Sequence, residues 1–208
     1  LVVTTAKGAD AGQAGKLPKY VTESGYEEFE DVRTRVGRNA PVPQRLWLAE
    51  LASGKLTELH VDPLPGIHDD PLAALRKAAG KDALKGNRPL QITGDSSALK
   101  WSSDSRNAAV MLRAIDNKDR WIASVDLAKA TLQPRHRLHD DAWINWGFNE
   151  FGWMPDNHTL WYLSEESGFS HLYTLDGGKR VQRTDGPWET SQVVVSRDGT
   201  RFYFLCNR

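Results

Sequence analysis

A unit of sequence recurs in the second half of this chain, and each copy opens with a polar turn that carries an aspartate. The turn aspartates are Asp104, Asp156 and Asp198, which lie 52 and 42 residues apart. This spacing is typical of the blades of a β-propeller, each of which is a small antiparallel sheet. The third copy is cut short at Arg208. We therefore expect the chain to be a portion of a larger protein.

The internal order of the copies supports the same interpretation. A run of β-branched and aromatic residues follows each turn, and in the two complete copies a further run carries an aromatic residue in its middle, Trp121 or Tyr173. An earlier copy is visible at 45–51, followed by the turn residues Ser53 and Gly54. We predict an all-β fold for residues 1–208, a partial β-propeller of about four consecutive antiparallel blades, incomplete at both ends.

The repeat also places the strands and the core. Strands are predicted near 108–115, 120–126, 159–164, 170–175 and 201–206. Turns are predicted near 104–107, 116–119, 156–158, 166–169 and 198–200. Large apolar residues in the middles of strands should be buried, and these are Trp47, Trp121, Leu163, Tyr173 and Phe204. The single cysteine, Cys206, lies in a predicted strand, where we expect a buried structural thiol.

One insertion interrupts the repeat. Trp47 and Trp121 lie 74 residues apart, whereas Trp121 and Tyr173 lie 52 apart, and the excess falls at about 61–88. We predict a short helix over 71–79 within it, with Asp70 as the N-cap, Pro71 at the first helical position and Gly80 at the C-terminal cap. Leu72 and Leu75 should form an apolar face that lies against the rim of the propeller.

Charge and composition exclude several classes of protein. Lys plus Arg and Asp plus Glu number 27 each, so the net charge is zero and a nucleic-acid partner is not expected. No apolar run approaches the roughly 18 residues of a membrane span. The acidic run 26–31 is followed by Arg33, Arg35 and Arg38, and we expect the two runs to neutralise each other. Nothing in the sequence predicts a cofactor.

Two polar groups could carry chemistry. His136, His139, Asp140 and Asp141 have the composition of a zinc site. However, histidines three residues apart on a strand point to opposite faces, so we favour a solvated connection and predict no metal. Asp116, Asp119 and Arg120 are expected at a hairpin tip, where their charges face water; a role in substrate access is the alternative.

Three further stretches carry a resemblance. RVGRNAP at 35–41 precedes the strand RLWLAEL, SEESGFSHLY at 164–173 combines an acidic turn with an aromatic residue and His, and TDGPWET at 184–190 has a Thr-x-Gly-x-Trp-Glu pattern. In this order they resemble the β-propeller of the dipeptidyl peptidase IV branch of the prolyl oligopeptidase family of serine peptidases. The resemblance covers residues 33–208.

The resemblance implies a parent protein with a C-terminal α/β-hydrolase domain and a Ser-Asp-His triad. The nucleophile of that domain sits on a Gly-x-Ser-x-Gly elbow. This chain holds no such five-residue pattern. We therefore assign it no catalytic residue and no hydrolase domain, and we expect the parent to be a serine-type dipeptidyl peptidase. The resemblance favours a periplasmic or secreted location.

The family also binds the free amino terminus of its substrates through paired glutamates on the propeller. A charged ammonium group that loses water needs such carboxylates. Glu27 and Glu28 are the candidates here, because their place in the order of motifs is nearest. Glu165 and Glu166 form a second pair, but they belong to a turn in a later blade.

The leading functional hypothesis is a non-catalytic propeller that shields the active site of its parent enzyme and restricts access to peptides. Its partners would be the hydrolase domain and, through the parent, a peptide substrate. The alternative is a free-standing TolB-like propeller that serves as a protein-interaction module. An open sheet edge around 202–205 should also seek a partner, either in a homo-oligomer or at residues 2–4.

Overall fold

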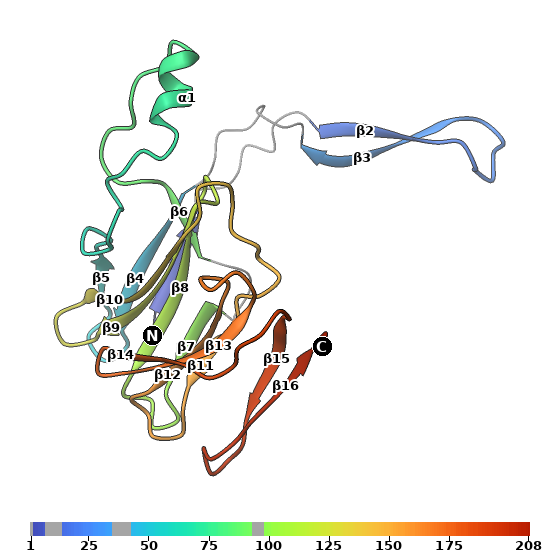
Figure 1. Cartoon of the computed structure of the whole chain (residues 1–208). Helices are drawn as coiled ribbons and strands as arrows, with labels where there is room; N and C mark the ends of the chain where they lie inside the picture. The colour runs from blue at the N-terminus through green and yellow to red at the C-terminus, as the bar shows by residue number, and fades with distance from the viewer. Residues whose placement is uncertain (1, 7–13, 35–42, 93–97) are drawn as a thin grey trace.

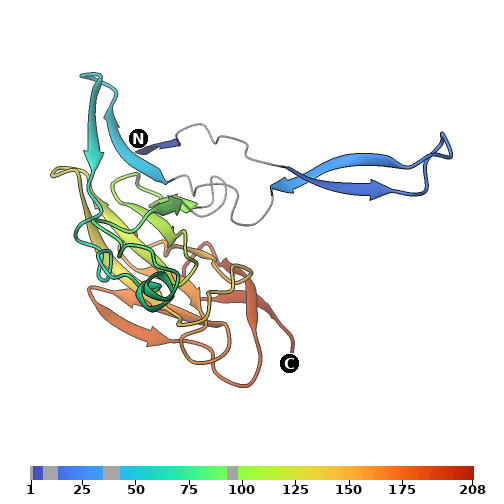
Figure 2. The same ribbon diagram turned by 90° about the horizontal axis from the view of Figure 1, so that it is seen from above.

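The computed structural model describes residues 2–6, 14–34, 43–92 and 98–208. Within these residues the strands form four antiparallel sheets and one separate two-stranded hairpin. The four sheets follow one another along the chain, and they lie side by side in Figures 1 and 2. We call them blades 1 to 4, and their arrangement agrees with the predicted all-β fold.

Blades 2 to 4 are built from consecutive strands, whereas in blade 1 the hairpin β2–β3 lies in the sequence between the first strand and the other two. Blade 1 contains β1 (Val2–Ala6), β4 (Gln44–Glu50) and β5 (Lys55–Leu59). Blade 2 contains β6 (Leu90–Ile92), β7 (Leu99–Trp101), β8 (Ala108–Ala114), β9 (Asp119–Asp126) and β10 (Thr131–His139). Blade 3 contains β11 (Phe151–Trp153), β12 (Leu160–Ser164), β13 (His171–Asp176) and β14 (Lys179–Gln182). Blade 4 contains β15 (Thr190–Val195) and β16 (Phe202–Cys206).

The predicted strands and turns are confirmed. Every predicted strand matches an observed one within two residues at each end. The three aspartate turns contain residues with positive φ, which are Ser105 at 60°, Asn157 at 64° and Gly199 at 70°. Short polar residues and glycine tolerate that conformation, which explains why polar turns separate the strands so regularly.

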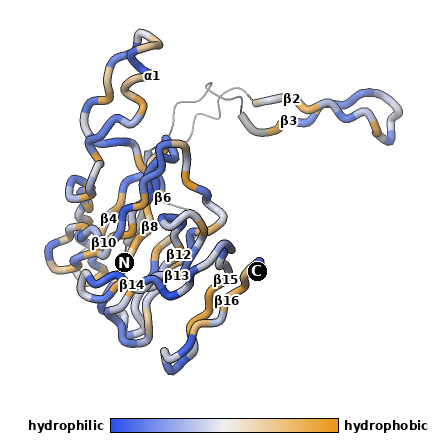
Figure 3. Tube along the Cα trace, in the orientation of Figure 1, coloured by the Kyte–Doolittle hydropathy of each residue, from blue (hydrophilic) through white to orange (hydrophobic). Residues whose placement is uncertain are grey.

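Side-chain alternation along the strands creates one apolar layer between each pair of blades. On β8, Val110 and Leu112 pack with Leu46 of blade 1, while Met111 packs with Tyr162 of blade 3. On β12, Leu163 turns the other way and packs with Val193 of blade 4. Because successive residues of a strand point to opposite faces, one strand serves two layers. Figure 3 shows apolar residues along β8, β15 and β16.

The burial predictions are confirmed where a blade lies on both sides. Trp121 and Leu163 are 0% exposed, and Tyr173 is 3% exposed. Trp47 and Phe204 are only half-buried. The prediction of a buried thiol was wrong, because Cys206 is exposed. It lies at the end of β16, which in the described chain pairs with β15 alone.

The insertion contains the predicted helix in a shorter form. Helix α1 spans Ala73–Ala78, and its N-cap is Leu72, so the assignments of Asp70 as N-cap and of Pro71 as the first helical residue were wrong. Asp70 instead accepts hydrogen bonds from the backbone N–H groups of Leu72 (3.1 Å) and Leu84 (3.0 Å). The φ of 64° at Gly80 fits the predicted C-terminal cap.

The predicted apolar contact of this helix was also wrong. Leu75 is 68% exposed, and none of the helical residues is buried. Figure 1 shows α1 standing away from the blades. The remainder of the insertion does pack, since Leu64 and Ile67 belong to the apolar layer between blades 1 and 2.

A separate hairpin, which we call the arm, consists of β2 (Ala14–Lys19) and β3 (Glu28–Thr34). It projects from the stacked blades in both views (Figures 1 and 2), and its strands pair only with each other. Its exposed large apolar residues are Leu17, Tyr20, Val21, Tyr26, Phe29 and Val32.

The acidic run of the arm is neutralised mainly by lysines. Lys19 contacts Glu30 at 2.6 Å, and Lys16 pairs with Asp31. The expected neutralisation by the arginines that follow this run stays a prediction, because the side chain of Arg33 lies outside the described part of the chain. Arg35, Arg38 and the whole stretch 35–41 also lie outside the described residues. β1 pairs with β4, so residues 2–4 do not pair with β16 as one alternative proposed.

The sequence predicted no membrane span, and α1 (Ala73–Ala78) has only six residues. In the part of the chain that the structure describes, no helix is long and apolar enough to cross a membrane.

Candidate functional site

One edge of the blades gathers most of the polar residues that the sequence singled out. This connection edge comprises residues 62–89, 115–119, 139–150 and 164–170. The backbone N–H groups of Asp140 and Ile144 donate to the carbonyls of Lys118 (3.0 Å) and Asn117 (2.9 Å). These bonds join the connection between blades 2 and 3 to the β8–β9 turn.

Asp119 and Arg120 lie at the centre of this edge, and the prediction that their charges face water was wrong. Both residues are 0% exposed. Strand β9 already begins at Asp119, so the two consecutive side chains point to opposite faces of the sheet. Asp119 faces the insertion and Arg120 faces blade 3, which places one buried charge on each side of the strand.

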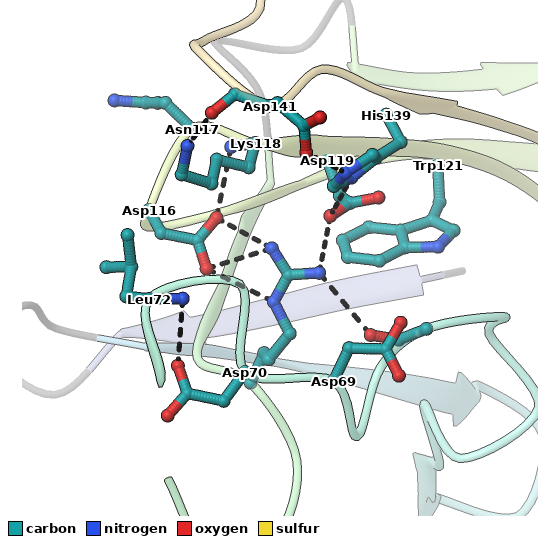
Figure 4. Close-up of polar contacts among 12 residues, drawn as sticks. Asp69, Asp70, Leu72, Asp116, Asn117, Lys118, Asp119, Trp121, His139 and Asp141 are labelled. Atoms are coloured by element: carbon teal, nitrogen blue, oxygen red, sulfur yellow. Dashed lines mark hydrogen bonds and ion pairs between the residues drawn. The ribbon is translucent and has the colours of Figure 1, made fainter. Parts of the chain in front are cut away.

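Asp119 is the centre of an ion-pair network (Figure 4). Its Oδ2 accepts a hydrogen bond from Arg88 Nη1 at 2.5 Å, and its Oδ1 accepts one from Arg137 Nε at 2.6 Å. His139 Nδ1 lies 3.0 Å from Oδ2. Arg88 also donates from Nη2 to the two carboxylate oxygens of Asp116, at 2.7 and 2.8 Å. Two carboxylates thus enclose one guanidinium group.

The network attaches the insertion to blade 2. Arg88 belongs to the end of the insertion, and its backbone N–H donates to the carbonyl of Ile67 at 2.8 Å. Trp121 Nε1 donates to the carbonyl of Pro65 at 2.9 Å, and its ring lies 5.5 Å from the Arg88 guanidinium. Arg137 reaches Asp69 at 3.4 Å. The polar contacts therefore hold the base of the insertion, while α1 stays free of the core.

The environment shifts the pKa values in this network in opposite directions. Burial alone would raise the pKa of Asp119, but the hydrogen bonds from Arg137, Arg88 and His139 outweigh it, and the pKa lies below its usual range. The hydrogen bond to Asp119 raises the pKa of His139. These shifts favour the ionised forms of both partners.

Arg120 has a different environment. Its Nη1 donates to Asn149 Oδ1 at 2.5 Å and to the carbonyl of Leu163 at 3.0 Å. Both acceptors are neutral, and the Nε and Nη2 atoms have no hydrogen-bond partner in the described part of the chain. Burial lowers the pKa of Arg120 to about 10. The guanidinium is thus less well stabilised than that of Arg88.

Glu165 and Glu166, in the β12–β13 turn of blade 3, border the layer between blades 2 and 3. Glu166 Oε2 lies 3.0 Å from His136 Nε2 and accepts a hydrogen bond from Arg180 Nη1 at 2.8 Å. Burial lowers the pKa of His136. Glu165 contacts Asn145 Nδ2 at 3.5 Å, and its pKa is raised by burial and by the charge of Glu189. The two glutamates lie in a turn between strands, as the sequence indicated. Glu166 pairs with His136 and Arg180.

The two histidines of β10 point in opposite directions, as predicted. His136 faces Glu166 of blade 3, whereas His139 faces Asp119. Across the described ranges, no group of three or more His, Cys, Asp or Glu side chains could hold a metal ion. Asp140 and Asp141 follow the end of β10, in the predicted connection.

The predicted amine-binding residues, Glu27 and Glu28, lie at the arm instead of the connection edge. Glu28 is the first residue of β3 and accepts a hydrogen bond from Ser24 Oγ at 2.8 Å. Both glutamates are exposed. Their role in binding an ammonium group stays a prediction.

Sequence reasoning missed Arg88, Tyr162 and Ser164 as members of the polar layers. Nothing in the local pattern around Arg88 marks it, because its partners lie 28 and 31 residues further along the chain. The sequence did contain a signal that Asp119 and Arg120 are buried. The two residues directly precede Trp121 and continue the alternation of its strand, which places them in the strand and outside the turn.

A family profile and several solved structures relate this chain to known proteins. The profile of the dipeptidyl peptidase IV (DPP IV) N-terminal region matches residues 96–208, more than half of the chain. No curated protein matches the sequence significantly.

Solved structures show the same fold. A Bacteroides ovatus protein assigned as a dipeptidyl aminopeptidase IV matches 99% of this chain and 28% of its own, with a TM-score of 0.61 and 13% identity. Porphyromonas gingivalis dipeptidyl peptidase 4 matches 95% of this chain and 24% of its own, with a TM-score of 0.60 and 15% identity. Acinetobacter baumannii TolB reaches a TM-score of only 0.44 over 78% of this chain and 32% of its own, at 17% identity. The chain thus spans about a quarter of the two peptidase structures.

Proposed function

The chain belongs to the family of dipeptidyl peptidase IV N-terminal regions, and we propose that it shields the active site of a serine peptidase and restricts access to peptides. In this role the propeller portion is non-catalytic. The hydrolase domain of the parent protein is its partner, and peptides are the substrates of the parent.

The stacking of the blades is the observation that carries this proposal. Each pair of neighbouring blades shares an apolar cluster, and residues such as Met111, Ile122 and Leu163 are almost fully buried in these clusters. Protein interiors are close-packed, so a wall of blades with buried side chains between them excludes folded proteins. Substrates would therefore have to reach the active site through a restricted opening.

A substitution that loosens the wall tests this proposal. Ile122 lies between blades 2 and 3 and is 1% exposed, so Ile122→Ala in the parent protein removes packing there. Cleavage of a long or folded substrate should rise relative to cleavage of a chromogenic dipeptide. Leu56→Ala is the matched control, because Leu56 is 62% exposed.

An unchanged ratio of the two activities in a folded Ile122→Ala protein would contradict the shielding role. A parent reading frame with no hydrolase domain would instead support the free-standing interaction module. The structural match to TolB is too weak to favour that alternative.

We also propose that the open edge of β16 finds a partner strand, in a homo-oligomer or in the parent protein. Tyr203 and Leu205 are 57% and 56% exposed beside this edge. Unpaired strand edges with apolar side chains tend to associate. Sedimentation of the purified chain tests this, and a monomer at all concentrations would exclude the homo-oligomer.

A further inference from the structure

Arg120 is a fully buried cation that lacks a counter-charge in contact with it. Its hydrogen bonds to described residues go to two neutral acceptors, Asn149 Oδ1 and the Leu163 carbonyl. Among the residues that the structure describes, no carboxylate forms an ion pair with this guanidinium, and two of its three nitrogens are unpartnered. An uncompensated buried charge strongly destabilises a folded protein. This charge therefore calls for a compensating partner.

Further unpartnered polar atoms lie in the same layer between blades 2 and 3. They are Tyr162 Oη, Ser164 Oγ and His136 Nδ1. Tyr162 and Ser164 are two residues apart on β12 and so point to the same face, on either side of the Leu163 carbonyl that receives Arg120. The His136 ring lies 4.4 Å from the Tyr162 ring. Tyr162 packs with Met111 and Ile122 of blade 2, so the hydroxyl groups of this face and the Arg120 guanidinium belong to the same layer.

The nearby carboxylates are used elsewhere. Glu166 is balanced by Arg180 at 2.8 Å and by its contact with His136. Glu165 contacts Asn145 Nδ2 at 3.5 Å, and burial, together with the charge of Glu189, raises its pKa. Within the described ranges, neither glutamate forms an ion pair with Arg120.

We propose that Arg120 binds one small monovalent anion of the chloride class, together with the hydroxyl groups of Tyr162 and Ser164. The anion would supply the missing charge and accept hydrogen bonds from donors of both blades. Because Arg120 and Ser164 are 0% exposed, the layer is closed to large anions. The bound anion would therefore tie blade 2 to blade 3.

Thermal unfolding of the wild-type protein in chloride is the first test. Chloride replaces gluconate at constant ionic strength, so that general screening does not change. We expect a saturable rise of about 5–11 °C in the unfolding midpoint between trace chloride and chloride at about 100 times its Kd. In crystals grown with bromide, an anomalous peak should lie within hydrogen-bond distance of Arg120. Equal midpoints in chloride and gluconate, or a water in place of bromide, would overturn the proposal.

Substitutions locate the effect. Arg120→Met should abolish the chloride dependence, whereas Arg201→Met, which removes an exposed guanidinium, should retain it. Glu165→Gln removes a competing negative charge and should tighten chloride binding several-fold. Chloride dependence that appears only in Glu165→Gln would identify Glu165 as the counter-ion and refute the anion site. If Arg120→Met does not fold, the bromide experiment on the wild type decides.

Discussion

Replacing Arg88 by Met tests whether the buried ion-pair network holds the insertion. Methionine keeps much of the volume of the side chain and removes the guanidinium group. The Arg88 side chain is 0% exposed, and its Nη1 and Nη2 atoms bind Asp119 at 2.5 Å and Asp116 at 2.7 Å. The substitution therefore removes charge-assisted bonds from two carboxylates at once.

The structure sets the expected magnitude. Loss of one partner of a buried ion pair costs about 3–5 kcal/mol of unfolding free energy. Asp119 keeps Arg137 and His139, and Asp116 is 14% exposed and gains water, so we expect the lower end, about 3 kcal/mol. For a chain of this length the unfolding midpoint should fall by about 6–12 °C.

Chemical denaturation measures this change, and amide hydrogen exchange locates it. Exchange should accelerate at 62–89 more than in blade 3, because the hydrogen bond from Arg88 N to the Ile67 carbonyl is part of the attachment. Lys19→Met is the matched control, since Lys19 and Glu30 are both about half exposed and their pairing should have no measurable effect. A loss below about 1 kcal/mol for Arg88→Met, or uniform exchange, would refute the attachment role.

Three further predictions concern pH, catalysis and substrate binding. Burial lowers the pKa of His136, so the stability that neutral His136 allows is present above about pH 6.5 and is lost as pH falls. The hydrogen bond to Asp119 raises the pKa of His139, so the stability that charged His139 adds is present below about pH 6.5 and is lost as pH rises. His136→Gln and His139→Gln should therefore change the pH dependence of the unfolding free energy between pH 5 and 8 in opposite senses. The isolated chain should not cleave a chromogenic dipeptide, because it has no nucleophile elbow; turnover that survives rigorous purification would contradict this. In the parent enzyme, Glu27→Gln with Glu28→Gln should raise KM for substrates with a free amino terminus and leave kcat little changed, and an unaltered KM would exclude the amine-binding role.

The blades were predictable from the sequence because their signals are local. The alternation of apolar residues and the aspartate turns act within about ten residues of chain. The same alternation separated His136 from His139 correctly. It also contained the information for Asp119 and Arg120, which the interpretation as a hairpin tip overlooked.

The rest of the site depends on partners that are distant in sequence. Arg88 binds Asp119, which lies 31 residues further along the chain, and no local sequence pattern predicts such a contact. The exposure of Cys206 depends on which strand lies beyond β16. Helix α1 has only six residues, too few to be stable without tertiary contacts, so its packing could not follow from propensity.

The arm is stabilised apart from the rest of the protein, and this independence bears on how its sequence can change. Among the residues that the structure describes, its two strands pair only with each other, and its ion pairs, such as that of Lys19 with Glu30, are internal. Substitutions there should scarcely alter the cooperative unfolding of the blades. Selection for stability would therefore leave the sequence of the arm free to diverge. Related proteins could exchange this hairpin for another and keep the same scaffold beneath it.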